Sequence, residues 1–118
     1  MCYDIFHVTG DRFFAALSAR VGSIGDNRLG GWYSYRAAKA ALNQLIHTAA
    51  IEVARSHKQA ICVTLHPGTV ATAFTEKYHT HAAVPADEAA KNLLSVIERL
   101  KPSDTGRFFD WTGAEVAW

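Results

Sequence analysis

Cysteine is scarce in this sequence, which holds only Cys2 and Cys62 among 118 residues. Two cysteines cannot build the framework of bridges that stabilises small secreted domains. No apolar run reaches the length that crosses a membrane, and residues 1–5 lack the charged and then apolar order of a secretory signal. We therefore expect a soluble, cytoplasmic protein in a reducing compartment.

The chain also lacks an excess of charge of either sign. Lys and Arg total 12 and Asp and Glu total 11, which gives a formal net charge of +1 without a basic stripe or an acidic tail. This balance argues against nucleic acid and membranes as partners, and favours small neutral or weakly charged ones. Apolar residues make up 49% of the chain, which is typical of a globular protein, and the length predicts one domain at most.

The chemistry of the chain centres on Tyr35 and Lys39. On a helix, positions i and i+4 share a face, so the phenol and the ammonium group can point into one site. A positive charge beside a phenol favours the phenolate form, which makes Tyr35 a candidate general acid or base that Lys39 tunes. An exposed amphipathic pair is the other interpretation of this spacing.

Hydrophobic patterning predicts strands that alternate with helices around this pair. Buried strands are expected over residues 13–17, 60–65 and 106–111, with helices over 34–56, capped by Ser34, and over 86–100. The alanines of the first helix imply close packing against another helix. The buried stripe of the second helix is expected to contain Ala90, Leu93, Leu94, Ile97 and Leu100.

Other conspicuous side chains have structural interpretations. His79 and His81 lie two residues apart without a nearby Cys, Asp or Glu cluster, so they indicate a solvated loop and no metal site is predicted. His47, on the long helix, is expected to be a packing or interface residue. The tryptophans are expected to be core or interface anchors: Trp32, Trp111 and Trp118.

Three stretches together resemble the C-terminal half of the short-chain dehydrogenase/reductase family: residues 17–25, 34–43 and 63–72. The phrase from Ser18 to Asn43 is most similar to the carbonyl-reductase branch related to the C-factor and sniffer proteins. The resemblance runs from about Arg12 to Trp118. It implies an α/β fold, a partial Rossmann-like half-domain of three layers with a mainly parallel sheet.

The resemblance also defines what the chain lacks. Members are about twice as long, and begin with a glycine-rich turn that holds the cofactor pyrophosphate at a helix N-terminus. Thr9 and Gly10 start like that turn, but the later glycines are missing. We therefore expect a single truncated domain over 1–118, with a divergent segment over 1–11, a C-terminal end that is complete, and a sheet completed by homo-oligomerisation through the alanine-rich helix.

The resemblance implies a catalytic trio of Ser18, Tyr35 and Lys39. Tyr35 would donate a proton to a carbonyl oxygen as hydride arrives from a nicotinamide ring, and Lys39 would also bond the nicotinamide ribose. Members commonly carry two serines after the strand and use the second, whereas this chain has Ser18 followed by Ala19. Ser18 is the favoured candidate because it follows the strand directly, and Ser23 is the alternative; either can instead satisfy loop backbone groups.

The expected cofactor is NADP or NAD, and the expected substrate is a small carbonyl compound. The resemblance places four residues along the nicotinamide and its carboxamide: Pro67, Gly68, Val70 and Thr72. Pro-Gly after a strand is otherwise simply a turn. The sequence therefore predicts an NAD(P)H-dependent carbonyl reductase or a non-catalytic oligomeric remnant, a binding or scaffold module derived from such an enzyme. An incomplete gene product, or half of a two-chain enzyme, is a further alternative. The retained active-site phrase favours the first, and the missing phosphate-binding half favours the second.

Overall fold

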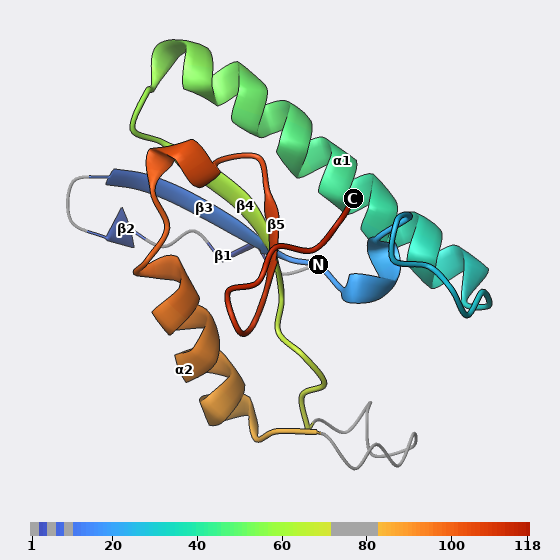
Figure 1. Cartoon of the computed structure of the whole chain (residues 1–118). Helices are drawn as coiled ribbons and strands as arrows, with labels where there is room; N and C mark the ends of the chain where they lie inside the picture. Colours follow the sequence, from blue (N-terminus) through green and yellow to red (C-terminus); the bar gives the residue numbers. More distant parts are fainter. Residues whose placement is uncertain (1–2, 5–6, 9–10, 72–82) are drawn as a thin grey trace.

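Three parallel strands form the centre of the computed structural model, which describes residues 3–4, 7–8, 11–71 and 83–118 (Figure 1). These strands are β3 (Asp11–Leu17), β4 (Ile61–His66) and β5 (Phe108–Asp110). β4 lies in the middle, with Phe13 opposite Ile61 on one side and Thr64 opposite Phe108 on the other. The three predicted strands are confirmed, with bounds shifted by one or two residues.

Two short strands cover the far edge of β3. They are β1 (Tyr3–Asp4) and β2 (His7–Val8), and both pair with β3 in the antiparallel direction. Tyr3 lies opposite Ala16, and His7 lies opposite Arg12. No pattern in the sequence indicated these strands. They occupy backbone groups of β3 that an edge strand would leave open.

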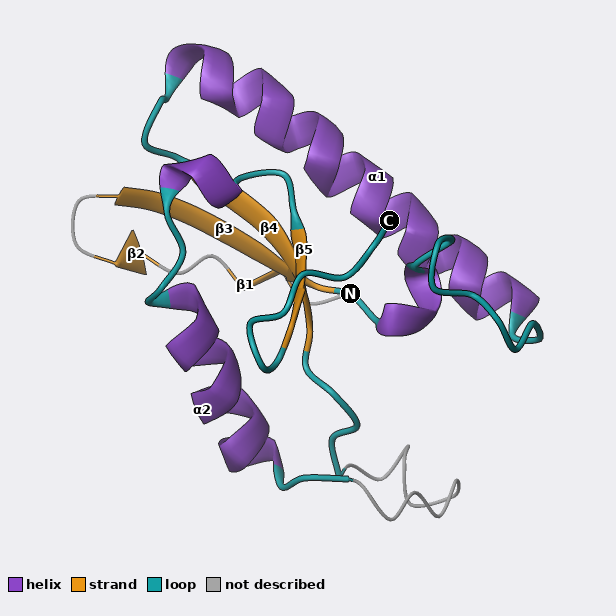
Figure 2. Ribbon diagram, in the orientation of Figure 1, coloured by secondary structure: helices purple, strands orange, loops and turns teal. Residues whose placement is uncertain are grey.

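Two helices cover opposite faces of the sheet, α1 (Tyr33–Ser56) and α2 (Ala86–Ile97) (Figure 2). Successive strand residues point to opposite faces, so each helix meets alternate side chains. The cluster on the α2 side contains Phe13, Ala15, Ile61, Val63, Leu65, Val96, Ile97 and Phe109. The cluster on the α1 side contains Ala16, Leu42, Ile46, Ala50 and Cys62. The predicted α/β fold of three layers is thereby confirmed.

The start of α1 differs from the prediction. Trp32, not Ser34, is the N-cap, and it has φ 56° and ψ 36° with no side-chain capping bond. Gly30 and Gly31 precede it with φ of 67° and 70°. Three consecutive residues in the left-handed region bring the chain into the helix, a path that glycine adopts without strain. The prediction of a Ser34 cap was wrong because this backbone path starts the helix before Ser34.

The buried stripe of α2 was predicted only in part, and Ile97 is the one predicted residue that is buried. Ala89, Val96 and Ile97 are the buried residues of the helix, whereas Ala90 is exposed and Leu94 is 45% exposed. Leu93 and Leu100 do pack against the core, as expected. Positions three and four apart fit a helical face in more than one rotation, so spacing alone did not fix which rotation faces the sheet.

The tryptophans are not core residues of this chain, because Trp32, Trp111 and Trp118 are 55%, 44% and 39% exposed. Their interpretation as interface residues stays a prediction. The predicted packing role of His47 is confirmed. Its Nδ1 lies 2.7 Å from the carbonyl oxygen of Gly106, and its ring centroid lies 5.3 Å from that of Trp118.

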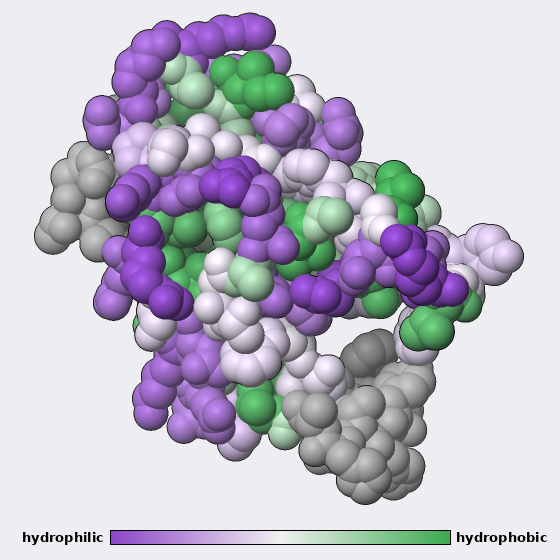
Figure 3. Space-filling model, in the orientation of Figure 1, coloured by the Kyte–Doolittle hydropathy of each residue, from purple (hydrophilic) through white to green (hydrophobic). Residues whose placement is uncertain are grey.

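α1 buries one face and exposes the other. Leu42, Ile46 and Ala50 point to the sheet, whereas Leu45 is 64% exposed and three alanines of the same outer face are also exposed: Ala37, Ala38 and Ala41. Apolar surface interrupts the hydrophilic surface along this helix (Figure 3). Among the described helices, none is long and apolar enough to cross a membrane.

Candidate active site

The carboxyl ends of the three parallel strands meet at one edge of the sheet. The short 3-10 helix Arg20–Gly22 follows β3, a loop begun by Pro67 follows β4, and β5 ends at Asp110. A cavity of about 720 Å³ opens there, between these loops and the first turn of α1. Its size suits a small-molecule ligand, and open α/β sheets bind ligands at this edge.

The cavity brings most of the predicted site residues together. Its walls include Ser18, Tyr35, Pro67, Gly68 and Val70. Lys39 and Ser23 are not among the lining residues. Thr72 lies outside the residues that the structure describes, as do His79 and His81. The roles assigned to these residues from the sequence stay predictions.

Ser18 is positioned by bonds to two neighbouring elements. Its backbone N–H donates to the carbonyl oxygen of Leu65 over 2.8 Å, which continues the β3–β4 pairing. Its hydroxyl donates to Oδ1 of Asn43 on α1 over 2.6 Å. Ser18 is 5% exposed and Asn43 is 2% exposed. The hydroxyl proton of Ser18 is therefore held by α1 and does not point freely into the cavity.

Lys39 lies beside Tyr35, one helical turn further along α1. Its Nζ is 5.9 Å from the centroid of the Tyr35 ring and donates to the carbonyl oxygen of Leu17 over 3.1 Å. Gly22 permits this arrangement, because a Cβ at that position would lie 2.7 Å from the Lys39 Cβ. Tyr35 itself is 44% exposed on the cavity wall. The two side chains thus share one face of α1, as their spacing predicts.

Ser23 has a local structural role. Its side chain is 1% exposed, and its Oγ accepts a hydrogen bond of 3.0 Å from the backbone N–H of Asp26. The hydroxyl therefore stabilises the turn that leads into the glycine-containing loop. Between the two candidate serines, the structure brings Ser18 to the cavity wall and turns Ser23 into the loop.

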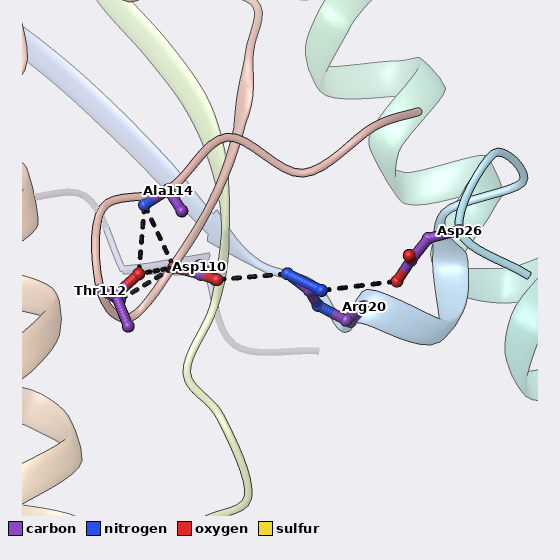
Figure 4. Close-up of polar contacts among 5 residues, drawn as sticks. All are labelled: Arg20, Asp26, Asp110, Thr112 and Ala114. Carbon is purple, nitrogen blue, oxygen red and sulfur yellow. Dashed lines mark hydrogen bonds and ion pairs between the residues drawn. The ribbon is translucent and has the colours of Figure 1, made fainter.

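An ion-pair network unites the carboxyl ends of β3 and β5. Arg20 Nη2 lies 3.2 Å from Asp110 Oδ2, and Arg20 Nη1 lies 3.5 Å from Asp26 Oδ2 (Figure 4). Asp110 Oδ1 also accepts bonds from the Thr112 hydroxyl and from the backbone N–H groups of Thr112 and Ala114. Burial acts to raise the pKa of Asp110, but these bonds and the Arg20 charge outweigh it and hold the pKa below its usual value.

His66 lies on the cavity wall, where the charges of Arg20 and Asp110 both act on it. It stands opposite Asp110 in the β4–β5 register, and its Nδ1 is buried without a hydrogen-bond partner among the described residues. Burial lowers the pKa of His66, the Arg20 charge adds to that effect, and Asp110 opposes it. The imidazole is therefore neutral at pH 7.

Sequence reasoning missed Arg20, His66, Asp110 and Asn43 as site residues. The available signal was position, because Arg20, His66 and Asp110 each lie within three residues of the end of a predicted strand. Parallel strands bring such residues to one edge. The partnership of Asn43 with Ser18 had no local signal, because it depends on how α1 rotates over the sheet.

Within the described ranges, no group of three or more His, Cys, Asp or Glu side chains comes together as a metal site would require. Another part of the cavity wall comes from the loop after β4, which contributes Pro67, Gly68, Thr69 and Val70. Gly68 has φ 77°, and a Cβ there would lie 2.9 Å from Cδ1 of Trp111. Gly68 thus lies against Trp111, with no room for a side chain between them.

The sequence matches no family model. Among curated proteins, it is 37% identical over 107 residues to the C-signal protein of Myxococcus xanthus. The aligned region covers 91% of this chain and 61% of that protein. It is 36% identical over 103 residues to 1-hydroxy-2-glutathionyl-2-methyl-3-butene dehydrogenase of Rhodococcus sp.. The aligned region covers 86% of this chain and 45% of that protein. The chain thus spans about half the length of the curated relatives it matches.

Solved structures show the same relationship. The NADPH-bound carbonyl reductase from chicken fatty liver aligns with a TM-score of 0.81 and 34% identity, over 91% of this chain and 43% of that one. The carbonyl reductase Sniffer of D. melanogaster aligns with a TM-score of 0.79 and 28% identity, over 91% of this chain and 41% of that one. These likenesses confirm that the sheet and both helices are arranged as in Rossmann-like reductases.

Proposed function

Because the chain belongs to the short-chain dehydrogenase/reductase family and spans about half the length of its matched members, we propose that it forms the catalytic part of an NAD(P)H-dependent carbonyl reductase. One observation carries the proposal: Ser18, Tyr35 and the Pro67–Val70 wall line one cavity. The cofactor, NADP or NAD, would supply hydride to the carbonyl carbon. The residues of this chain hold the substrate and move the proton.

Tyr35 is the proton donor in this proposal. Its phenol stands on the cavity wall, where it can donate to the oxygen of a bound carbonyl group. Lys39 lies beside the ring, with its Nζ 5.9 Å from the ring centroid, and an ammonium group has three donors. One of these binds Leu17, so the others remain for the hydroxyls of a nicotinamide ribose.

Ser18 has a weaker role than Tyr35 in this conformation, because its hydroxyl proton is held by Asn43. It would have to rotate to polarise a substrate carbonyl. The nicotinamide end of the cofactor fits the residues present, since the lining from Pro67 to Val70 offers apolar side chains together with Thr69. In the described part of the chain, no glycine-rich turn serves the pyrophosphate.

The test is an equilibrium titration of the purified chain with NADPH and with NADH, followed by an assay of carbonyl reduction. Tyr35→Phe should lower kcat by about 100-fold or more, the usual contribution of a positioned proton donor. Ser18→Ala should lower kcat by a smaller factor. Tyr33→Phe is the matched control, because Tyr33 is 87% exposed and does not line the cavity. Absence of binding up to millimolar cofactor would refute a stand-alone reductase.

A second candidate function is a non-catalytic module that works by self-association. The observation that favours it is the exposed apolar face of α1, where Leu45 is 64% and Ile51 is 50% exposed. Exposed apolar surface on a helix is commonly covered by another chain. We assign this face to a homo-oligomer, which sedimentation of the purified chain tests. A stable oligomer without cofactor binding would favour this function over the first.

We place the protein in the cytoplasm. The thiol of Cys62 is free and buried, and burial raises its pKa, so it stays protonated and unreactive. A free thiol is usual in a reducing compartment. Fractionation of cells that carry a tagged chain checks the location, and recovery from an oxidising compartment would contradict it.

A further inference from the structure

The cavity wall carries more positive than negative charge, although the chain as a whole is nearly neutral. Three arginines line it, together with one carboxylate, Asp26. Arg20 is compensated, because it lies 3.5 Å from Asp26 and 3.2 Å from Asp110. The other two arginines, Arg28 and Arg36, determine whether the cavity attracts anions.

Arg36 donates only to backbone carbonyl oxygens. Its Nε binds Gly31 at 2.9 Å, and its two terminal nitrogens bind Val21 and Gly30, each at 3.2 Å. Carbonyl groups satisfy the guanidinium hydrogens but carry no net charge. Over the described ranges, no carboxylate lies within ion-pair distance of Arg36. Its charge therefore remains uncompensated while its side chain holds the loop before α1.

Arg28 also lacks a carboxylate partner among the residues described. Its Nη1 donates to the carbonyl oxygens of Gly25, at 2.9 Å, and Asn27, at 3.4 Å. The side chain is exposed on the cavity lining, and its Nε and Nη2 donate no hydrogen bond to a described residue. A guanidinium group binds a carboxylate through two parallel N–H groups, so Arg28 retains the geometry for an anionic ligand.

The start of α1 adds to the positive potential. The helix has no acidic residue in its first turn and no side-chain cap at Trp32, and Trp32, Tyr35 and Arg36 of this end line the cavity. The N-terminus of a helix carries a partial positive charge. Beside it, Leu29 and Trp32 are 94% and 55% exposed. Hydrophilic and apolar surface lie next to each other at this end of α1 (Figure 3).

We propose that this cavity selects carbonyl substrates that carry a carboxylate on an apolar body, with Arg28 as the residue that binds the carboxylate. The apolar body would rest on Leu29 and Trp32, and the carbonyl group would reach Tyr35. This inference rests on the proposed reductase function. Overall composition favoured a small neutral or weakly charged partner, and the charges of the cavity wall specify an anionic one. Arg28 is a specificity residue, and it takes no part in proton transfer.

The experiment compares 4-carboxybenzaldehyde with 4-methylbenzaldehyde, two probes of similar shape that differ in charge. The wild-type chain should have the lower KM for the carboxylate. Arg28→Gln should reduce that preference about fivefold, as expected for one solvent-exposed ion pair, and Arg28→Lys should retain most of it. Arg55→Gln, at the opposite end of α1, is the charge-matched control. The preference should also weaken as salt shortens the Debye length, from about 30 Å at 0.01 M to about 3 Å at 1 M.

Three results would overturn the inference: equal KM values for the two aldehydes, an unchanged preference in Arg28→Gln, or an effect of that variant on the cofactor KM alone, which would assign the arginine to cofactor phosphate. If neither aldehyde is turned over, the reductase proposal fails, and ligand-observed NMR of the same two probes decides the inference by itself. Tighter binding of 4-carboxybenzaldehyde that depends on Arg28 would then support it. Equal binding, or no binding, would refute it.

Discussion

The hydroxyl of Ser18 donates a hydrogen bond of 2.6 Å to Oδ1 of Asn43, and both side chains are almost fully buried. The bond joins the residue that follows β3 to the middle of α1. It therefore fixes the end of the strand against the helix that carries Tyr35 and Lys39. It also sets the direction of the hydroxyl, because a buried donor keeps its partner unless another acceptor replaces it.

Ser18→Ala should lower the free energy of unfolding by about 1–3 kcal/mol, because Asn43 Oδ1 would lose its donor in a buried site. Urea denaturation measures the change. Ser34→Ala is the control, since Ser34 is exposed and should change stability by less than about 0.5 kcal/mol. In a double-mutant cycle, Ser18→Ala and Asn43→Ala should show a coupling energy above about 0.5 kcal/mol. Independent effects would mean that the bond contributes nothing.

Gly22→Ala should destabilise the chain by about 1–3 kcal/mol, because the new Cβ would lie 2.7 Å from Lys39 Cβ and 2.8 Å from the Lys39 backbone carbon. Helix backbone cannot move aside without disturbing α1. Gly31→Ala separates this steric effect from backbone strain, since Gly31 has φ 70° with nothing within 4 Å, and should cost about 1 kcal/mol. Equal stability of the wild type and Gly22→Ala would show that the 3-10 helix is not packed tightly against Lys39.

The sequence predicted three strands and both helices, because short apolar runs and helical spacing are local patterns. It did not predict which rotation of α2 faces the sheet, as Ala90 and Leu94 show, since several rotations satisfy a helical spacing. The pairing of β1 and β2 with β3 depends on contacts between distant segments. Of the site, the proximity of Tyr35 and Lys39 followed from an i,i+4 spacing. The Arg20–Asp110 pair spans most of the chain, so no local pattern could reveal it.

His66 should make stability fall as the pH falls below 6.5, the ordinary pKa of the imidazole. The folded state holds this pKa lower, so in that range the unfolded chain binds a proton that the folded chain resists, and unfolding is favoured until the pH reaches the folded pKa. The melting temperature, measured from about pH 8 to about pH 5, should decline in the wild type and less steeply in His66→Gln. If the melting temperature declined equally in both proteins, His66 would not be the cause of the decline.

Asp110 should produce a separate loss of stability at more acid pH. Its folded pKa lies below the ordinary value of 3.8, so its stabilising effect is fully present above that value and is lost as the pH falls through the folded pKa. Asp110→Asn should make the stability depend less on pH in this acid range. At pH 7 it should lower the free energy of unfolding by about 1 kcal/mol, because the ion pair with Arg20 is removed. If Asp110→Asn lost stability at acid pH as steeply as the wild type, the loss would belong to other carboxylates.

Leu45→Glu should dissociate the proposed homo-oligomer. Leu45 lies on the outer face of α1 with three exposed alanines, small side chains that allow two helices to approach closely. The proposed oligomer would bury Leu45, and a charge there removes about 1.5–3 kcal/mol of apolar burial per side chain. The dissociation constant should therefore rise at least about tenfold. Sedimentation equilibrium measures it. Ile24→Glu is the control, because Ile24 is 77% exposed but lies in the loop before α1. A wild-type chain that stays monomeric, or an equal response to both substitutions, would mean that this face of α1 is not the interface.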